Sequence, residues 1–206
     1  MSTVALTQSM PLPVDPGWVP SSLYRLTLGQ YEAMVDSGIF TGRERVHLIN
    51  GFLVAKMTQN DSHSTADILC GDELDRVLPP GWHVRPAKPI RIPSPGSDSK
   101  PEPDRCVARG GVRDYSRRSP GPADIALVVE VSDSSLDDDR KQSEIYGRAG
   151  IPFYWIVNLV DGQVEVYSNP GPSGYQSLDV LAPGHVLTVI IDGVEVGQIP
   201  GADILP

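Results

Sequence analysis

Residues 125–160 decide the predicted fold, and they read IALVVEVSDSSLDDDRKQSEIYGRAGIPFYWIVNLV. The beginning of this segment is apolar except for Glu130, which is typical of a strand buried on both faces. Ser134-Ser135 followed by three aspartates favours a helix start, and Gly150 favours the end of that helix. The apolar run 153–159 then predicts another strand. The segment is therefore expected to form a strand, helix and strand unit.

Further short strands are expected after this unit. The segment VDGQVEVYS, residues 160–168, contains an Asp161-Gly162 turn, and apolar runs recur at 175–181, 186–191 and 194–198. These strands are predicted to be antiparallel. They could complete the main sheet, form a small second sheet or pair across a dimer.

The elements that precede the unit are indicated by caps, turns and apolar spacing. Thr27 and Gln30 have the spacing of a capping box, and Asn50-Gly51 is a strong hairpin signal. From these signals we expect a helix at 28–37, a hairpin within 45–57, a helix at 62–78, strands at 82–85 and 88–92, a short strand at 106–108 and an insertion loop at 109–123.

Together these elements predict an α/β or α+β domain, with a mixed sheet flanked by helices and additional antiparallel strands over 160–198. The first residues, 1–23, contain four prolines and no periodic apolar pattern, so they are expected to form an N-terminal arm. Residues 24–206 are then expected to form a single domain.

Composition excludes several classes of protein. The 206 residues carry a net charge of −9, and no apolar run is long enough to span a bilayer or to act as a secretory signal. A cytoplasmic protein without a membrane partner is expected. Cys70 and Cys106 lack metal-ligand spacing and are predicted to be reduced and buried. The acidic balance opposes strong non-specific nucleic-acid binding.

Two carboxylates are the strongest candidates for chemistry. Glu130 interrupts a buried strand, where an ionised carboxylate needs a partner, a hydrogen bond, a proton or a cation. Asp104 follows Pro103 at the start of another short apolar segment. If the two strands are neighbours, Asp104 and Glu130 can converge on one divalent ion, with water completing its ligands. A strand end or a structural ion pair is the alternative for Glu130.

The segments PEPD, ALVVEVSDSSLDDDRK and IYGRAGIPFYWIVNLVD resemble the putative restriction endonuclease family of the PD-(D/E)XK nuclease superfamily. The resemblance spans about 24–168. It implies a four-stranded mixed sheet flanked by helices and phosphodiester hydrolysis that depends on Mg²⁺ or Mn²⁺. It also implies that Asp104 and Glu130 are the metal ligands, and that DNA is the substrate.

The lysine of the family pattern is displaced in this sequence. Ser132 stands two residues after Glu130, where the superfamily has its lysine. The family is expected to carry this lysine four residues before the tyrosine of the next helix, and that position is Gln142, with Lys141 beside it. Either Lys141 reaches the site, or Gln142 positions the attacking water as a neutral group.

Two histidines are possible accessory residues. His47 stands where the family often has a glutamate, and it could bind a metal or a phosphate or simply be a packed residue. His63 matches a histidine that the family commonly carries, at the start of the second helix. It could bind an anion there or lie on the surface.

Other charged and aromatic residues near the site have simpler interpretations. Tyr146 is expected to pack between helix and sheet. Residues Asp137 to Asp139 are expected to be solvated charges that complement the helix dipole. The arginines of the insertion loop could contact phosphate or form a soluble surface; they are Arg109, Arg113, Arg117 and Arg118.

Three functions are compatible with these residues. The favoured hypothesis is a metal-dependent DNA endonuclease that uses Asp104, Glu130 and either Lys141 or Gln142. The alternative is a catalytically inactive, nuclease-like module that binds nucleic acid or protein, which the missing lysine and the acidic charge favour. The third hypothesis is a structural domain whose edge strands build a homodimer, and it is compatible with either of the others.

Overall fold

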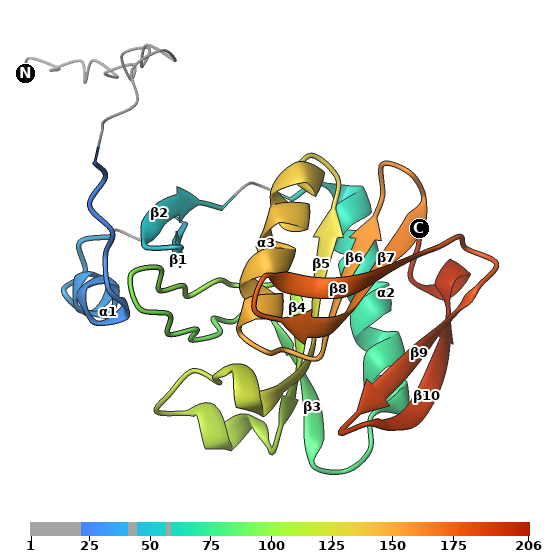
Figure 1. Cartoon of the computed structure of the whole chain (residues 1–206). Coiled ribbons are helices and arrows are strands. Elements are labelled where there is room, and N and C mark those ends of the chain that lie inside the picture. Colours follow the sequence, from blue (N-terminus) through green and yellow to red (C-terminus); the bar gives the residue numbers. More distant parts are fainter. Residues whose placement is uncertain (1–21, 41–44, 57–58) are drawn as a thin grey trace, which may run out of the picture.

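The computed structural model describes residues 22–40, 45–56 and 59–206, and its centre is a six-stranded mixed sheet (Figure 1). The strands follow the order β3-β4-β5-β6-β7-β8. Their bounds are β3 (Trp82–Pro86), β4 (Arg105–Arg109), β5 (Ile125–Ser132), β6 (Phe153–Asn158), β7 (Gln163–Gly171) and β8 (Gly174–Leu181). Only β5 and β6 pair in parallel, and this confirms the predicted mixed sheet.

The strand, helix and strand unit forms as predicted from β5, α3 (Leu136–Arg148) and β6. All eight residues of β5 are buried, so this strand is covered on both faces. Helix α3 packs over β6, β7 and β8, whereas α2 (Asp61–Val77) contacts β3 and β5 on the opposite face (Figure 1). Glu130 alternates with Val129 and Val131 along the strand, and it therefore points to the α3 face.

The N-terminal elements lie at one end of the sheet (Figure 1). Helix α1 (Leu28–Asp36) begins with the predicted capping box, because Thr27 and Gln30 bond reciprocally. Strands β1 (Val46–Ile49) and β2 (Phe52–Ala55) form the predicted hairpin, whose Asn50-Gly51 turn has positive φ at both residues. A bridge from Leu48 to Lys100 joins this hairpin to the loop that precedes β4.

Residues 88–92 do not form the predicted strand. Ala87 has a φ of 40°, which turns the chain away from β3, and Pro89 cannot donate to a ladder. Ile92 forms one isolated bridge with Ser99, and Ile90 is buried in the core beneath α3. The apolar pattern that predicted a strand therefore reflects burial of a loop.

The predicted insertion loop contains two short 3₁₀ helices, Val112–Tyr115 and Pro122–Asp124. The C-terminal strands divide between two of the predicted arrangements. Strands β7 and β8 extend the main sheet to six strands, where the family resemblance implied four. Strands β9 (Val186–Ile191) and β10 (Val194–Pro200) form a separate two-stranded sheet that packs against α2.

Within the described ranges, no helix combines the length and apolar character needed to cross a bilayer. An N-terminal arm is predicted at 1–23. Residues 1–21 of this segment lie outside the described part of the chain.

Both cysteines are fully buried, Cys70 in α2 and Cys106 in β4. Burial raises the pKa of each thiol to about 12. Because the thiolate is the reactive form, we expect the folded protein to show no reaction with Ellman's reagent at pH 8 and both thiols to react in guanidinium chloride. Rapid modification of the native protein would contradict the packing of α2 on the sheet.

Candidate active site

The structure brings Asp104 and Glu130 together at the junction of β4 and β5. Asp104 immediately precedes β4, whose Arg105 pairs with Val129 of the antiparallel β5. The Asp104 backbone N–H donates to Glu130 Oε2 at 3.0 Å, and the Val131 N–H donates to Asp104 Oδ2 at 3.0 Å. These reciprocal bonds hold the two carboxylates in adjacent positions.

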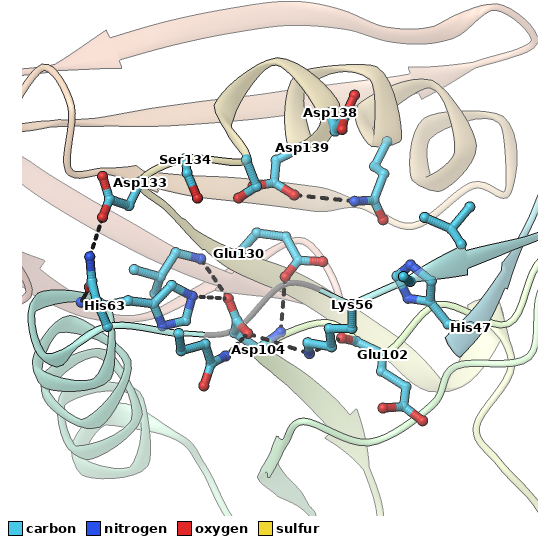
Figure 2. A pocket seen from close by; sticks show the side chains of 17 residues that line it. His47, Lys56, His63, Glu102, Asp104, Glu130, Asp133, Ser134, Asp138 and Asp139 are labelled. Atoms are coloured by element: carbon cyan, nitrogen blue, oxygen red, sulfur yellow. Dashed lines mark hydrogen bonds and ion pairs between the residues drawn. The ribbon is translucent and has the colours of Figure 1, made fainter. Parts of the chain in front are cut away.

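The pair lies in a cavity of about 130 Å³ between the hairpin, the N-terminal end of α2 and the N-terminal end of α3 (Figure 2). The cavity walls are strongly acidic. Six acidic residues line them: Glu102, Asp104, Glu130, Asp133, Asp138 and Asp139. In the part of the chain that the structure describes, Lys56 is the single lysine or arginine on these walls.

The pKa values of the two central carboxyl groups are shifted in opposite directions. Burial, together with the charges of Asp104 and Asp139, raises the pKa of Glu130 well above its ordinary value. Burial alone would also raise the pKa of Asp104. The hydrogen bond and charge of His63, the Val131 N–H and the charge of Lys56 outweigh it and lower that pKa. Asp104 is therefore the more readily ionised carboxylate.

His63 contacts the carboxylate pair directly. Its Nε2 lies 3.0 Å from Asp104 Oδ2, and the side chain is buried in the first turn of α2 (Figure 2). Burial disfavours the imidazolium, but the hydrogen bond and charge of Asp104 prevail and raise the pKa of His63. This placement favours the functional interpretation of His63 over the surface one.

His47 lines another part of the cavity. It lies in β1 opposite Val54 of β2, and its Nδ1 has no hydrogen-bond partner among the described residues. Burial and the charge of Lys56 lower the pKa of His47 to about 4. The ring is thus neutral near pH 7.

Asp139 was expected to be solvated, but the structure corrects this expectation. Its side chain is buried, and its Oδ2 accepts hydrogen bonds from Ser132 Oγ at 2.5 Å and Ser135 Oγ at 2.6 Å. Burial raises its pKa. Asp139 precedes Gln142 by three residues and Tyr146 by seven, so helical spacing puts all three on one face. That spacing was the signal for its position in the site.

Gln142 and Lys141 of α3, the two candidates for the position of the family's lysine, lie in different places. Gln142 lines the cavity, where its Nε2 donates to Asp139 Oδ1 at 3.2 Å and its buried Oε1 has no partner among the described residues. Lys141 is not brought into the cavity. Its side chain is 75% exposed and pairs with Asp138 at 3.0 Å. The geometry favours Gln142.

Lys56 and Gln59 belong to the site but carried no clear sequence signal, and Tyr146 has a contact there beyond its predicted packing. Lys56 follows β2, and its Nζ lies 3.6 Å from Asp104 Oδ1. Gln59 Nε2 donates to the same oxygen at 2.9 Å. Tyr146 packs between helix and sheet as predicted, and its hydroxyl also donates to Glu130 Oε1 at 3.3 Å.

The arginines of the insertion loop lie outside the cavity lining. Arg109 pairs with Asp192 and lies over the Trp82 ring, and Arg118 pairs with Asp124. These pairs favour the interpretation of Arg109 and Arg118 as surface residues over phosphate contacts at the carboxylate pair.

The donor set fits a hard divalent cation. No group of three or more His, Cys, Asp or Glu side chains could by itself hold a metal ion among residues 22–40, 45–56 and 59–206. Mg²⁺, however, is commonly bound by one or two carboxylates, with water and substrate phosphate as its other ligands. Asp104 and Glu130 provide two such carboxylates, in a cavity whose acidic excess a cation would neutralise.

The fold and this acidic cavity define a nuclease-like protein, and the comparisons with known proteins agree. Residues 28–197 match the family Uma2, described as putative restriction endonuclease. The chain belongs to this family. No curated protein matches the chain significantly.

The fold is also similar to a crystal structure of a putative nuclease belonging to DUF820 from Anabaena variabilis ATCC 29413. The TM-score is 0.65 at 16% sequence identity, and the match covers 87% of this chain and 97% of the other. At this identity the similarity establishes the fold.

Proposed function

We propose that this protein is a metal-dependent DNA endonuclease whose active site is the cavity around Asp104 and Glu130. The observation that carries the proposal is that backbone hydrogen bonds hold these two buried carboxylates side by side: the Asp104 N–H donates to Glu130, and the Val131 N–H donates to Asp104. Membership of the nuclease family supports a nucleic-acid substrate. We propose that residues 24–206 form the nuclease domain, consistent with a family match over 28–197.

In this proposal Asp104 and Glu130 hold Mg²⁺ or Mn²⁺. The bound ion supplies positive charge to the scissile phosphate and lowers the pKa of the attacking water. His63 holds the Asp104 carboxylate through its Nε2, and Tyr146 holds Glu130 through its hydroxyl. Each ligand is thus held by a second residue that limits its rotation.

Gln142 is proposed to orient the attacking water. Its Nε2 is held by Asp139, which two serine hydroxyls hold in turn, and its Oε1 remains available to accept a hydrogen bond. Water then adds across one P–O ester bond. Its oxygen bonds to phosphorus, the ester oxygen leaves with a proton, and a phosphomonoester end and a hydroxyl end result.

Calorimetric titration of Mn²⁺ tests this proposal without a guess about sequence specificity. We expect the wild-type protein to bind Mn²⁺ saturably and Glu130→Gln to bind at least about 10-fold more weakly, because a charged ligand is lost. In parallel, wild-type protein with Mg²⁺ or Mn²⁺ is expected to cleave plasmid DNA, and excess EDTA is expected to abolish cleavage.

The control for this titration is Glu144→Gln, which removes an exposed carboxylate from α3 outside the cavity. Identical Mn²⁺ binding by wild type, Glu130→Gln and Glu144→Gln would overturn the proposed metal site. Binding of DNA without cleavage under every metal condition would favour the inactive, nucleic-acid-binding module instead.

The proposed homodimer stays a prediction. Strand β8 forms one edge of the main sheet and has no second strand partner among the described residues. Its exposed Leu178 and Val180 provide an apolar surface beside that edge.

A further inference from the structure

We propose that Lys56 binds the scissile phosphate, so that the cation facing the substrate comes from the hairpin and not from α3. This inference rests on the proposed function, because it assigns a substrate contact within the same cavity. Lys56 occupies the wall of the cavity formed by β2, beside Asp104 and Glu102 (Figure 2).

The hairpin fixes the direction of this side chain. The Lys56 backbone N–H donates to the Arg45 carbonyl at 2.7 Å, which extends the β1–β2 ladder by one residue pair. Alternate residues of a strand point to the same face, and directly opposed residues share a face. Val54, Lys56 and His47, the partner of Val54, therefore all face the cavity, and all three line it.

The Lys56 ammonium group lies beside the carboxylate pair and has at least one hydrogen-bond donor that is not used there. Lys56 Nζ donates to the Glu102 carbonyl at 2.8 Å and lies 3.6 Å from Asp104 Oδ1. The side chain is only 12% exposed. Because an ammonium has three donors, at least one remains for a phosphate oxygen.

A purely structural ion pair explains this arrangement less well. Asp104 already accepts hydrogen bonds from His63, the Val131 N–H and Gln59, all at 2.9 to 3.0 Å. The Lys56 contact with Asp104 is longer than any of these. The carboxylate is therefore satisfied without Lys56.

The acidic character of the cavity supports a role for Lys56 in binding phosphate. The acidic residues of the cavity repel a phosphodiester, although Lys141 pairs with Asp138 and His63 with Asp104, and a positive side chain beside the carboxylate pair reduces that repulsion. Along the described part of the cavity wall, Lys56 is the one lysine or arginine available to a phosphate. Gln142 of α3 also lines the cavity and is neutral, so phosphate binding is assigned to Lys56 and water orientation to Gln142.

The test measures binding of a labelled DNA duplex with phosphorothioate linkages, in the presence of Mn²⁺, as a function of salt. We expect Lys56→Gln to weaken binding about 10-fold and to reduce the salt slope by about 1, as for loss of one phosphate contact. Lys56→Arg, which retains the charge, is expected to bind within about 3-fold of wild type. Lys88→Gln removes an exposed lysine outside the cavity and is expected to bind like wild type.

Mn²⁺ affinity distinguishes phosphate binding from a structural role. If Lys56 contacts phosphate, Lys56→Gln binds Mn²⁺ as tightly as wild type or more tightly, because a positive charge beside the carboxylates is removed. Weaker Mn²⁺ binding together with unchanged DNA binding would show that Lys56 merely orders Asp104, and this would overturn the proposal.

Cleavage of unmodified DNA separates this inference from the proposed function. If wild type cleaves DNA and Lys56→Gln binds and cleaves it equally well, the role of Lys56 is overturned and hydrolysis stands. If wild type binds with the Lys56-dependent salt slope but does not cleave, phosphate binding stands and hydrolysis is overturned. If wild type binds no DNA with Mn²⁺ present, both proposals are overturned.

Discussion

Glu130→Gln is expected to lower the rate of metal-dependent DNA cleavage by roughly 10²–10³-fold or more, and at the same time to raise Tm. The loss of rate follows because the substitution removes one of the two charges proposed to hold the metal. The gain in stability follows because burial, together with the charges of Asp104 and Asp139, raises the pKa of Glu130 well above its ordinary value. Ionised Glu130 therefore opposes folding near neutral pH.

The raised pKa of Glu130 also fixes the sign of the pH dependence of stability. A carboxyl whose pKa is higher in the folded state than in the unfolded state lowers stability as the pH rises above the unfolded value. Stability of the metal-free protein should thus decrease between the ordinary glutamate pKa and neutrality. The amide introduced by Glu130→Gln does not titrate, so we expect Tm of this variant to exceed that of wild type at pH 7 and to match it more closely at acidic pH.

The amide can preserve the local hydrogen bonds. Glu130 now accepts from the Asp104 N–H and from the Tyr146 hydroxyl. In Glu130→Gln, the amide oxygen can accept from Asp104 while the amide nitrogen donates to the Tyr146 oxygen, because a phenol is both donor and acceptor. The fold should therefore be retained.

Thermal unfolding and cleavage rates of the same preparations check this prediction. Glu144→Gln, which changes an exposed carboxylate of α3, should cleave within about 2-fold of wild type, since surface changes have small effects. Loss of cleavage together with a lower Tm in Glu130→Gln would contradict the argument, because unfolding would then account for the lost activity.

Gly147→Ala is expected to destabilise the protein by about 2 kcal/mol and to lower Tm by roughly 4–8 °C. A Cβ at position 147 would lie 2.5 Å from the Tyr175 backbone N and 2.6 Å from the Gly174 carbonyl carbon. Both atoms are backbone of β8, so α3 and the sheet must move apart. The higher helix propensity of alanine offsets only about 1 kcal/mol of this cost.

Gly29→Ala is the matched control for this substitution. Gly29 is also a helical glycine, in α1, but an added Cβ there meets no atom within 4 Å apart from its chain neighbours and the backbone of its own helix. We expect Gly29→Ala to leave Tm unchanged or to raise it, as measured by circular dichroism. An equally stable Gly147→Ala would contradict the close packing of α3 on β8.

The effect of Gly147→Ala should extend to the active site. Helix α3 carries both Asp139 and Gln142, whose side chains line the cavity. A displacement of α3 moves them relative to Glu130 on β5. We therefore expect slower cleavage in this variant even at temperatures where it remains folded.

Much of the local structure could be predicted because short-range interactions decide it. The capping box of Thr27 and Gln30, the Asn50-Gly51 turn and the buried β5 strand depend on neighbours in sequence and on apolar spacing. The strand expected at 88–92 failed because its apolar side chains are buried in a loop. Burial alone does not distinguish a loop from a strand, and a proline removes one ladder donor there.

The sequence by itself determined the strand, helix and strand unit, and it predicted that Asp104 and Glu130 converge if their strands are neighbours. The unit depends on local patterns and forms with β5 parallel to β6, whereas the convergence of the two carboxylates depends on the antiparallel pairing of β4 with β5. Only the tertiary structure decided that Asp139 is buried, that Gln142 faces the cavity while Lys141 faces solvent, and that Lys56 reaches Asp104. Lys56 and Asp104 are distant in the chain, and no local interaction connects them. Their contact depends on how the hairpin packs against the end of the sheet.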